Sequence, residues 1–367
     1  MNAINTELLK LSLSPIAPWM DDPEVTDILV YGSKRVYVRR RDGGFVPVPA
    51  SWQSDDDLMT AAKTIGRQMA RRLDVKEPIL DARLPDKSRV NIIIDPCYNR
   101  GACIVIRKFP EQQFSLNDLV RFGAIDQSGK KILEIIVRLG KNILITGGTG
   151  SGKTTLLNSL CGFIPESDVV VTVEDAREIS MSHELWVALE TKRAVDSEDR
   201  EITLRDLIKA SLRMNPRWVI VGEVRGAEAL DLVRAFNTGH FGAGTIHASS
   251  AYDALLALES LILQSGLDVP SRAVKEMVSR AIHIVVHAGE LPDHSRRLLE
   301  IIEVEGLDYD RSASMPPYKT RTLYRFEFDR YDETGKAAGR FIVKEPPSWI
   351  NTLKQLPDIQ TPDFWRS

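Results

Sequence analysis

The chain has 367 residues, of which 43% are hydrophobic and 27% are charged, and its formal net charge is −3. This composition is typical of a globular protein and excludes a disordered chain or a fibre, while the length indicates two domains at roughly 150 residues each. The near-neutral charge provides no global basic field for nucleic acid. Because no apolar run approaches the roughly 18 residues of a membrane-spanning helix, and the N-terminus lacks a secretory signal, we expect a soluble protein.

The first 109 residues have the mixed pattern of an α+β domain. Helical spacing of apolar residues predicts a helix over Asp55–Leu73, with Ser54 as its N-cap. The polar segment 110–115 is the predicted linker to the next domain. The expected strands are Val25–Val30, Val36–Val38, Arg89–Ile94 and Cys103–Ile106.

Residues 116–345 alternate β-rich runs with helical stretches, which predicts an α/β fold with a mainly parallel sheet. Four near-continuous apolar runs fit strands that helices cover on both faces. These runs are Asn142–Ile145, Val169–Val173, Val219–Val221 and Ile282–Val286, and further β-like segments follow at Leu298–Val304, Thr322–Phe328 and Arg340–Val343. The proline-rich segment 346–367 is expected to be an irregular tail.

The strongest functional signal is a glycine-rich segment between an apolar strand and a helix. Residues 147–154 read GGTGSGKT and match the phosphate-loop pattern G-x-x-x-x-G-K-[ST] at every fixed position. Glycines let backbone N–H groups surround phosphate oxygens, Lys153 brings a cation to the β- and γ-phosphates, and the Thr154 hydroxyl can bind Mg²⁺. The predicted nucleotide-binding residues are Gly147, Gly148, Thr149, Gly150, Ser151, Gly152, Lys153, Thr154 and Thr155.

Two acidic residues follow predicted strands of the same sheet. Glu174 ends the run that begins at Val169, and Glu223 follows the run that ends at Val221. Residues just past the carboxyl ends of parallel strands line the ligand crevice of such sheets. Either carboxylate alone could be solvated or structural. Together with a phosphate loop they indicate catalysis, with Glu174 as base or water-positioning group and Glu223 holding Mg²⁺ through water.

Two histidines lie in a segment rich in glycine and threonine, at His240 and His247. A lone histidine is more often structural than functional. Two of them downstream of a metal-binding carboxylate favour a sensor for the γ-phosphate. We interpret the other histidines of this region, His283, His287 and His294, as structural.

The combination of four motifs resembles the secretion ATPase superfamily, the motors of type II and type IV secretion, conjugation and type IV pili. Gly147–Thr154 resembles the Walker A motif of that family, Val171–Glu178 its Asp box, Val219–Gly226 its atypical Walker B motif, and Thr238–Ala248 its His box. Segments outside the motor core, including Asp81–Asn91, are most similar to the Tad/Flp pilus-assembly branch.

The resemblance implies a RecA-like ATPase core that hydrolyses ATP with Mg²⁺ and assembles into a homohexamer. It also implies a place at the cytoplasmic face of the inner membrane, where an inner-membrane platform protein of a pilus or secretion system recruits the ring. Arginines reach the phosphates in such rings. The candidates in this chain are Arg107 in the N-terminal domain and Arg205, Arg213 and Arg225 in the core.

Two alternatives to a pilus or secretion motor stay open at this point. A RecA-like nucleic-acid translocase would need a basic channel with stacking aromatic residues. Aromatic residues make up 7% of the chain, and we interpret its clusters of arginine as solvated faces or subunit contacts, so we do not expect nucleic acid as a partner. A nucleotide-binding scaffold without turnover is disfavoured because acids and histidines accompany the phosphate loop.

Overall fold

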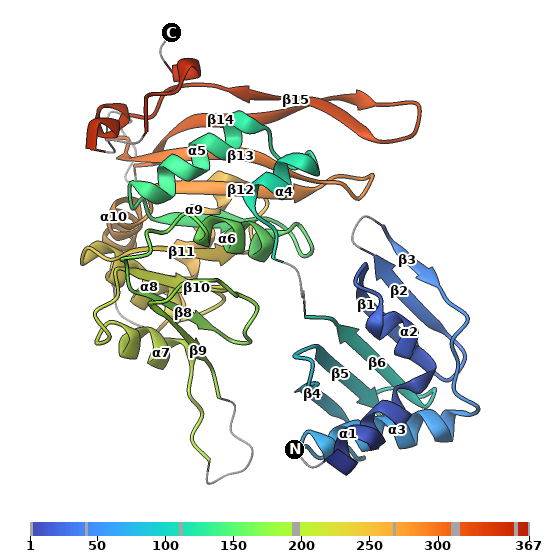
Figure 1. The fold of residues 1–367 in the computed structure, drawn as a ribbon. Coiled ribbons are helices and arrows are strands. Elements are labelled where there is room, and N and C mark those ends of the chain that lie inside the picture. The colour runs from blue at the N-terminus through green and yellow to red at the C-terminus, as the bar shows by residue number, and fades with distance from the viewer. Residues whose placement is uncertain are drawn as a thin grey trace. The chain divides into compact units, whose positions relative to one another are not determined.

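The computed structural model describes residues 3–40, 43–109, 113–192, 199–266, 269–309, 316–355 and 359–365. Contacts between Cα atoms divide the chain into two compact units, Met1–Gln112 and Gln113–Ser367. Half of the expected linker, residues 110–112, lies outside the described residues. Each unit is described below by itself (Figure 1).

The first unit is an antiparallel sheet with helices packed against one face. Its elements in chain order are α1 (Ala3–Ser12), η1 (Ser14–Ile16), α2 (Ala17–Asp21), β1 (Val25–Tyr31), β2 (Val36–Arg40), β3 (Phe45–Pro47), α3 (Asp55–Gln68), β4 (Ile79–Arg83), β5 (Arg89–Ile94) and β6 (Ala102–Arg107). The strands lie in the order β3-β2-β1-β6-β5-β4, and every neighbouring pair is antiparallel. Alternate residues of β5 are buried, as expected for a sheet with one covered face.

Helix α3 begins where the sequence predicts but ends earlier. The Ser54 hydroxyl accepts a hydrogen bond from the backbone N–H of Asp57, which caps the helix at its predicted start. The helix ends at Gln68 rather than at Leu73, because Ala70 takes a left-handed backbone conformation with φ of 52°. Leu58 and Ile65 on the inner face of α3 pack into a core shared with the sheet.

The second unit is built on one large mixed sheet. Its elements are α4 (Leu116–Arg121), α5 (Gln127–Arg138), β7 (Ile143–Thr146), α6 (Lys153–Cys161), β8 (Val170–Glu174), β9 (Trp186–Glu190), α7 (Leu204–Ser211), β10 (Trp218–Val221), α8 (Glu228–Asn237), β11 (Phe241–Ile246), α9 (Ala251–Leu263), α10 (Ser271–Ala281), β12 (Ile284–Glu290), β13 (Arg296–Leu307), β14 (Tyr318–Tyr331), β15 (Ala337–Val343), η2 (Ile350–Gln355) and η3 (Asp363–Trp365). The strand order is β15-β14-β13-β12-β7-β11-β10-β8-β9. Strands β12 to β9 in this order are parallel, and β12 to β15 form an antiparallel meander.

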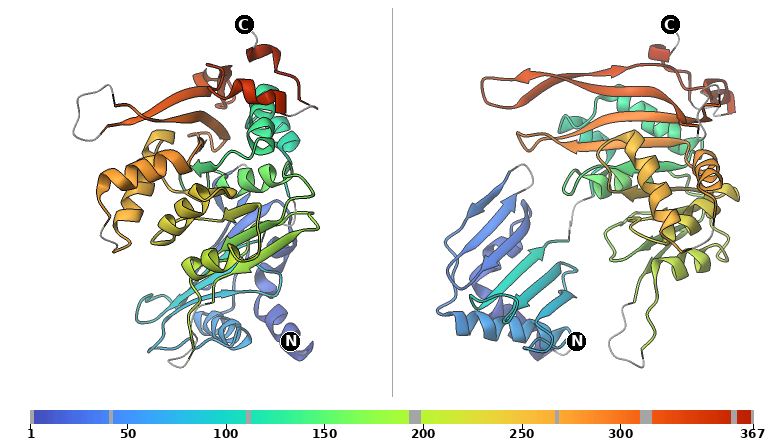
Figure 2. Two further views of the ribbon diagram at one scale, coloured as in Figure 1. Left: turned by 90° about the vertical axis from the view of Figure 1, so that its left-hand side faces the viewer. Right: turned by 180° about the vertical axis from the view of Figure 1, so that it is seen from behind.

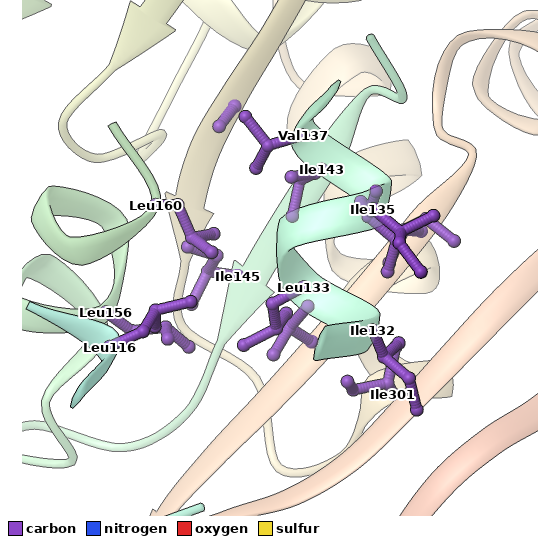
Figure 3. Close-up of a cluster of buried hydrophobic side chains, with 14 of the residues drawn as sticks. Leu116, Ile132, Leu133, Ile135, Val137, Ile143, Ile145, Leu156, Leu160 and Ile301 are labelled. Carbon is purple, nitrogen blue, oxygen red and sulfur yellow. The ribbon is translucent and has the colours of Figure 1, made fainter. Parts of the chain in front are cut away.

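Helices cover both faces of the parallel part of this sheet. Ile143 and Ile145 of β7 belong to a core with α4, α5 and α6, whereas Leu144 between them packs in a second core with α7 to α10. Two further views show the gold and orange helices α9 and α10 on one side of the sheet and the green helices on the other (Figure 2). Figure 3 shows Ile143 and Ile145 among the side chains of α5 and α6. These two cores fix the strand that leads into the phosphate loop.

Two segments differ from the sequence-based expectation. Strand β9 at the edge of the sheet was not predicted; its residues are only partly buried, so it lacks a continuous apolar run. The expected irregular tail instead contributes Leu353, Ile359 and Trp365 to the core around α5, and Lys141 lies over the ring of Trp349. Burial of apolar side chains therefore attaches the described part of this segment to the second unit.

No helix within the described residues is long and apolar enough to cross a membrane.

Candidate nucleotide-binding site

The phosphate loop connects the carboxyl end of β7 to the first turn of α6, as predicted. Gly152, directly before the helix, has φ of 93°, a conformation that favours glycine. Gly147 is required for a different reason, because a Cβ there would lie 2.0 Å from the carbonyl oxygen of Ala288. The loop therefore passes too close to β12 for any other side chain, and it presents its backbone at the positive end of α6.

Lys153 is held against the loop by its own ammonium group. Its Nζ donates to the carbonyl oxygens of Gly147 at 2.9 Å and Gly148 at 2.8 Å. The side chain is largely buried, and this desolvation lowers the pKa of Lys153, opposed in part by the negative charge of Glu223. The loop thus carries a fixed and desolvated cation at the position where phosphate chemistry needs one.

Glu223 lies at the centre of a short chain of charged groups. Its Oε1 is 2.6 Å from Nε2 of His247, and its Oε2 accepts a hydrogen bond from the guanidinium of Arg225. On the other side of the imidazole, Nδ1 of His247 is 3.4 Å from Nζ of Lys153. The structure therefore joins the phosphate loop, the predicted metal carboxylate and one predicted sensor histidine in one cluster.

Parallel strand pairing brings these residues to one edge of the sheet. Thr146 of β7 lies opposite Ile246 of β11, so Gly147 and His247 are the next residues on neighbouring strands. Val221 of β10 pairs with Val173 of β8 and with Gly244 of β11. Glu174 and Glu223 follow at that same carboxyl edge, where ligand crevices of open parallel sheets are found.

Glu174 is buried at the end of β8, with 2% of the residue exposed. Its Oε1 accepts hydrogen bonds from the backbone N–H groups of Glu178 at 2.8 Å and Ile179 at 2.9 Å. Its Oε2 is buried without a hydrogen-bond partner among the described residues. Desolvation outweighs the two N–H donors and raises the pKa of Glu174 to about 7. A carboxylate that titrates near neutrality is suited to accept a proton from water.

The structure separates His240 from the other predicted sensor histidine, His247. It directly precedes β11, whereas His247 directly follows it, so the two histidines lie at opposite ends of a six-residue strand. At about 3.3 Å per residue their backbones are roughly 20 Å apart. His240 Nδ1 instead lies 3.1 Å from the carbonyl oxygen of Ala235 and 3.2 Å from Oγ1 of Thr238. The structure therefore places His247, but not His240, beside the phosphate loop of its own chain.

The four candidate arginines are not gathered at one place. Arg225 contacts Glu223 at the loop, but Arg205 forms an ion pair with Asp231 at 2.6 Å between α7 and α8. Arg213 is exposed and precedes the amino end of β10, which is the opposite edge of the sheet. Arg107 belongs to the first unit, where its Nε is 3.1 Å from Oδ1 of Asp27. Of the three candidates in the second unit, Arg225 is the one that contacts a residue of the predicted site.

Two residues that connect the phosphate loop or the helix after it to other segments were not predicted. Arg296, at the start of β13, donates from Nε to the carbonyl oxygen of Gly150 at 2.7 Å. Asn158 of α6 accepts from the N–H of Ser180 at 3.1 Å and so ties the helix to the segment after Glu174. Arg296 is 146 positions from Gly150 and belongs to no local motif, so tertiary structure alone reveals it.

The predicted magnesium ligands are on the same edge of the sheet. Thr154 is the second residue of α6, and its side chain is half-buried. Among the described residues, no group of three or more His, Cys, Asp or Glu side chains could hold a metal ion. Mg²⁺ commonly takes one or two protein ligands and completes its shell with phosphate oxygens and water. The hydroxyl of Thr154 and the carboxylate of Glu223 fit such a site.

Comparison with known proteins identifies the family. A family model described as type II/IV secretion system protein matches residues 10–302. The chain belongs to this family. A putative conjugal transfer protein of Mycobacterium tuberculosis is 32% identical over 309 residues, which are 82% of this chain and 86% of that protein.

Two further similarities concern length and fold. An uncharacterised protein of Methanocaldococcus jannaschii is 30% identical over 322 residues, which are 87% of this chain but 56% of that protein. The chain thus spans little more than half the length of this relative. The X-ray structure of the Legionella pneumophila ATPase DotB has a TM-score of 0.58 at 19% identity, and the match covers 78% of this chain and 79% of that one. This likeness confirms the predicted α/β fold with a RecA-like core.

Proposed function

We propose that the chain is an ATPase motor that hydrolyses ATP with Mg²⁺ to power a type IV-like pilus or a type IV secretion or conjugation apparatus. The observation that carries the proposal is the cluster at the carboxyl edge of the sheet. There Lys153 Nζ lies 3.4 Å from His247 Nδ1, and His247 Nε2 lies 2.6 Å from Glu223 Oε1. A phosphate loop alone binds nucleotide, whereas an adjoining carboxylate and imidazole supply groups for hydrolysis.

The proposed division of labour follows from the position of each group. Backbone N–H groups of residues 147–155 and the Lys153 ammonium bind the phosphates, and Thr154 holds Mg²⁺ together with Glu223 through water. Glu174 has a raised pKa and an Oε2 atom without a partner among the described residues, and it accepts the proton of the attacking water. Bound Mg²⁺ neutralises charge that develops on the phosphates. His247, between Lys153 and Glu223, responds to the γ-phosphate, and Arg225 holds the Glu223 carboxylate through a hydrogen bond.

The proposal also covers the oligomeric state of the protein and its location in the cell. The family membership and the conjugal transfer relative support a motor that works in a secretion or pilus system. We propose a homohexamer of two-domain subunits, with residues 110–115 as the linker between domains 1–109 and 116–345. We further propose that it acts at the cytoplasmic face of the inner membrane through a platform protein. Arg107 and Arg213 are candidates for contacts with phosphates across subunits, and a Tad/Flp pilus system is the proposed context.

A steady-state hydrolysis assay with MgATP tests the proposed activity. We expect turnover in the wild type and its loss in Lys153→Ala and Glu223→Ala, while the matched change Lys209→Ala at an exposed position of α7 leaves it unchanged. Glu174→Gln should retain ATP binding and lose turnover. Normal turnover in Glu174→Gln would contradict the role of Glu174 as base. If the wild type binds ATP but does not hydrolyse it, the protein is a nucleotide-binding scaffold instead.

Two further measurements separate a secretion motor from a nucleic-acid translocase. Light scattering of the protein with MgADP should give the mass of a hexamer. Addition of single-stranded DNA should leave the hydrolysis rate unchanged at all salt concentrations. Stimulation by DNA that falls steeply with salt would favour the translocase.

A further inference from the structure

Residues of β12 and β13, on either side of the turn 291–295, contact the phosphate loop. The Ala288 carbonyl oxygen occupies the position that a side chain on Gly147 would need. The Arg296 side chain passes over the loop, with Cδ 3.5 Å from where a Cβ on Gly152 would lie. Its Nε donates to the Gly150 carbonyl oxygen at 2.7 Å. The antiparallel part of the sheet thus contacts the loop at three glycines.

The hydrogen bond from Arg296 sets the direction of one peptide unit of the loop. A trans peptide is planar, so its carbonyl and its N–H point in opposite directions. With the Gly150 carbonyl held by Arg296, the N–H of Ser151 is turned to the other side of that peptide. This N–H is 3.4 Å from the Gly148 carbonyl oxygen, a long hydrogen bond that a phosphate oxygen could replace. Arg296 therefore orients a donor of the anion-binding loop.

Apart from this long hydrogen bond, the contacts given for the loop involve neighbouring groups instead of the Gly150–Ser151 peptide. Ser151 Oγ and Lys153 Nζ both donate to the Gly148 carbonyl oxygen, at 2.9 Å and 2.8 Å. Gly148 and Thr149 are exposed, and Gly150 has φ of 78°, a conformation that glycine enters and leaves at little cost. Without a contact at its carbonyl oxygen, the Gly150 peptide would have many orientations available, and nucleotide binding would have to order it.

Arg296 is held in place by the turn that precedes it. The Leu291 N–H donates to the Ser295 carbonyl oxygen at 2.8 Å and closes the turn. Asp293 accepts from the Ser295 N–H at 3.0 Å and from the Ala337 N–H, at the start of β15, at 2.8 Å. The turn is thus anchored to the next hairpin of the sheet. A guanidinium that starts from such a turn is pre-organised for the loop.

We propose that Arg296 is a positioning residue for nucleotide binding, which orients the Gly150–Ser151 peptide of the phosphate loop through its hydrogen bond to the Gly150 carbonyl oxygen. This inference rests on the proposed function, because it concerns the same nucleotide site. Loss of a hydrogen bond from a charged donor changes an equilibrium by about tenfold or more. We expect the same loss of affinity for ATP and for ADP, since both present phosphates to the loop.

The test compares four full-length proteins: wild type, Arg296→Ala, Arg296→Gln and the control Arg325→Ala. Arg325 is on β14 and pairs with Glu300, so its loss removes an arginine of the same sheet without touching the loop. Fluorescence anisotropy with a labelled ADP in the presence of Mg²⁺ gives Kd, and hydrolysis kinetics give KM and kcat. Melting without nucleotide reports any purely structural effect.

We expect Arg296→Ala to raise Kd and KM about tenfold with kcat and the nucleotide-free melting temperature little changed. Arg296→Gln, which keeps an N–H donor, should restore Kd to within about threefold of wild type, as should Arg325→Ala. Unchanged Kd in Arg296→Ala, or a fall in kcat alone, overturns the inference. Should Arg296→Ala fail to fold, Arg296→Gln decides: a Kd raised tenfold or more in that variant also overturns it.

Different results would contradict the proposed nucleotide site and the positioning role of Arg296. Wild-type protein that binds no ADP would contradict the nucleotide site itself. Wild-type binding with an unaffected Arg296→Ala variant would contradict only the positioning role.

Discussion

Nε2 of His247 lies 2.6 Å from Oε1 of Glu223, while Nδ1 of the same ring faces Nζ of Lys153 at 3.4 Å. Glu223 follows β10 and His247 follows β11, and these are neighbouring parallel strands. One imidazole therefore bridges the carboxylate proposed to hold Mg²⁺ and the lysine of the phosphate loop. A change at the γ-phosphate could alter this contact directly.

His247→Ala tests this bridge. We expect hydrolysis of MgATP to fall by about 100-fold, in the range of effects seen for positioned acid–base groups, while Kd for MgADP stays within about threefold. The matched control is His183→Ala, whose ring contacts the carbonyl of Pro165 instead of the loop. A His247→Ala protein with full turnover would show that the bridge has no part in hydrolysis.

Glu174 gives a pH-dependent stability with a defined sign. Its pKa is raised from 4.5 to about 7 by burial, so the folded protein holds this proton more tightly than the unfolded chain. The protonated Glu174 carboxyl therefore stabilises the folded protein. This contribution to the free energy of unfolding is fully present below about pH 4.5 and is lost as the pH rises through 7. The loss is on the order of 3 kcal/mol.

Glu174→Gln removes this titration, because the amide oxygen can still accept the N–H groups of Glu178 and Ile179. We expect the variant to gain stability relative to wild type as the pH is raised from 5 to 8, by roughly 2–3 kcal/mol in the free energy of unfolding. Urea denaturation without nucleotide at several pH values measures it. A constant difference between the two proteins would contradict the raised pKa.

His240→Ala separates the two histidines. His240 precedes β11 at the edge of the sheet opposite the loop, so we expect Kd for MgADP within about twofold of wild type. The free energy of unfolding should fall by about 1 kcal/mol, because contacts of its Nδ1 with Ala235 and Thr238 are lost. Isothermal titration with MgADP and urea denaturation measure the two quantities. Weakened ADP binding in monomeric protein would contradict the observed placement.

Substitution of Asn142 tests how far its hydrogen bonds anchor β7, the strand that leads into the loop. This buried residue donates from Nδ2 to the Ala281 carbonyl oxygen at 2.8 Å and accepts at Oδ1 from the Gly242 N–H at 3.1 Å. Asn142→Ala leaves both backbone groups unpaired in the interior, so we expect a loss of roughly 2–3 kcal/mol in denaturant unfolding. The exposed Asn117→Ala on α4 should change it by less than about 0.5 kcal/mol. Equal effects would show that the network contributes little.

The sequence by itself determined the phosphate loop and the strands around it. The pattern of residues 147–154 fixes its chemistry locally, because glycine conformations, the lysine charge and the threonine hydroxyl act within one turn. Continuous apolar runs likewise predicted β7, β8, β10 and β12, since strands buried on both faces must be apolar throughout. Strand β9, which is half-exposed, carried no such signal.

Only the tertiary structure decided which distant residues meet that loop. His240 and His247 look alike in the sequence, but strand direction sends them to opposite edges of the sheet. Arg296 has no motif, and antiparallel pairing of β13 with β12 brings it to Gly150. The burial that raises the pKa of Glu174 depends on packing of several elements around one carboxyl group. Contacts and desolvation of this kind are properties of the folded chain, and no local spacing encodes them.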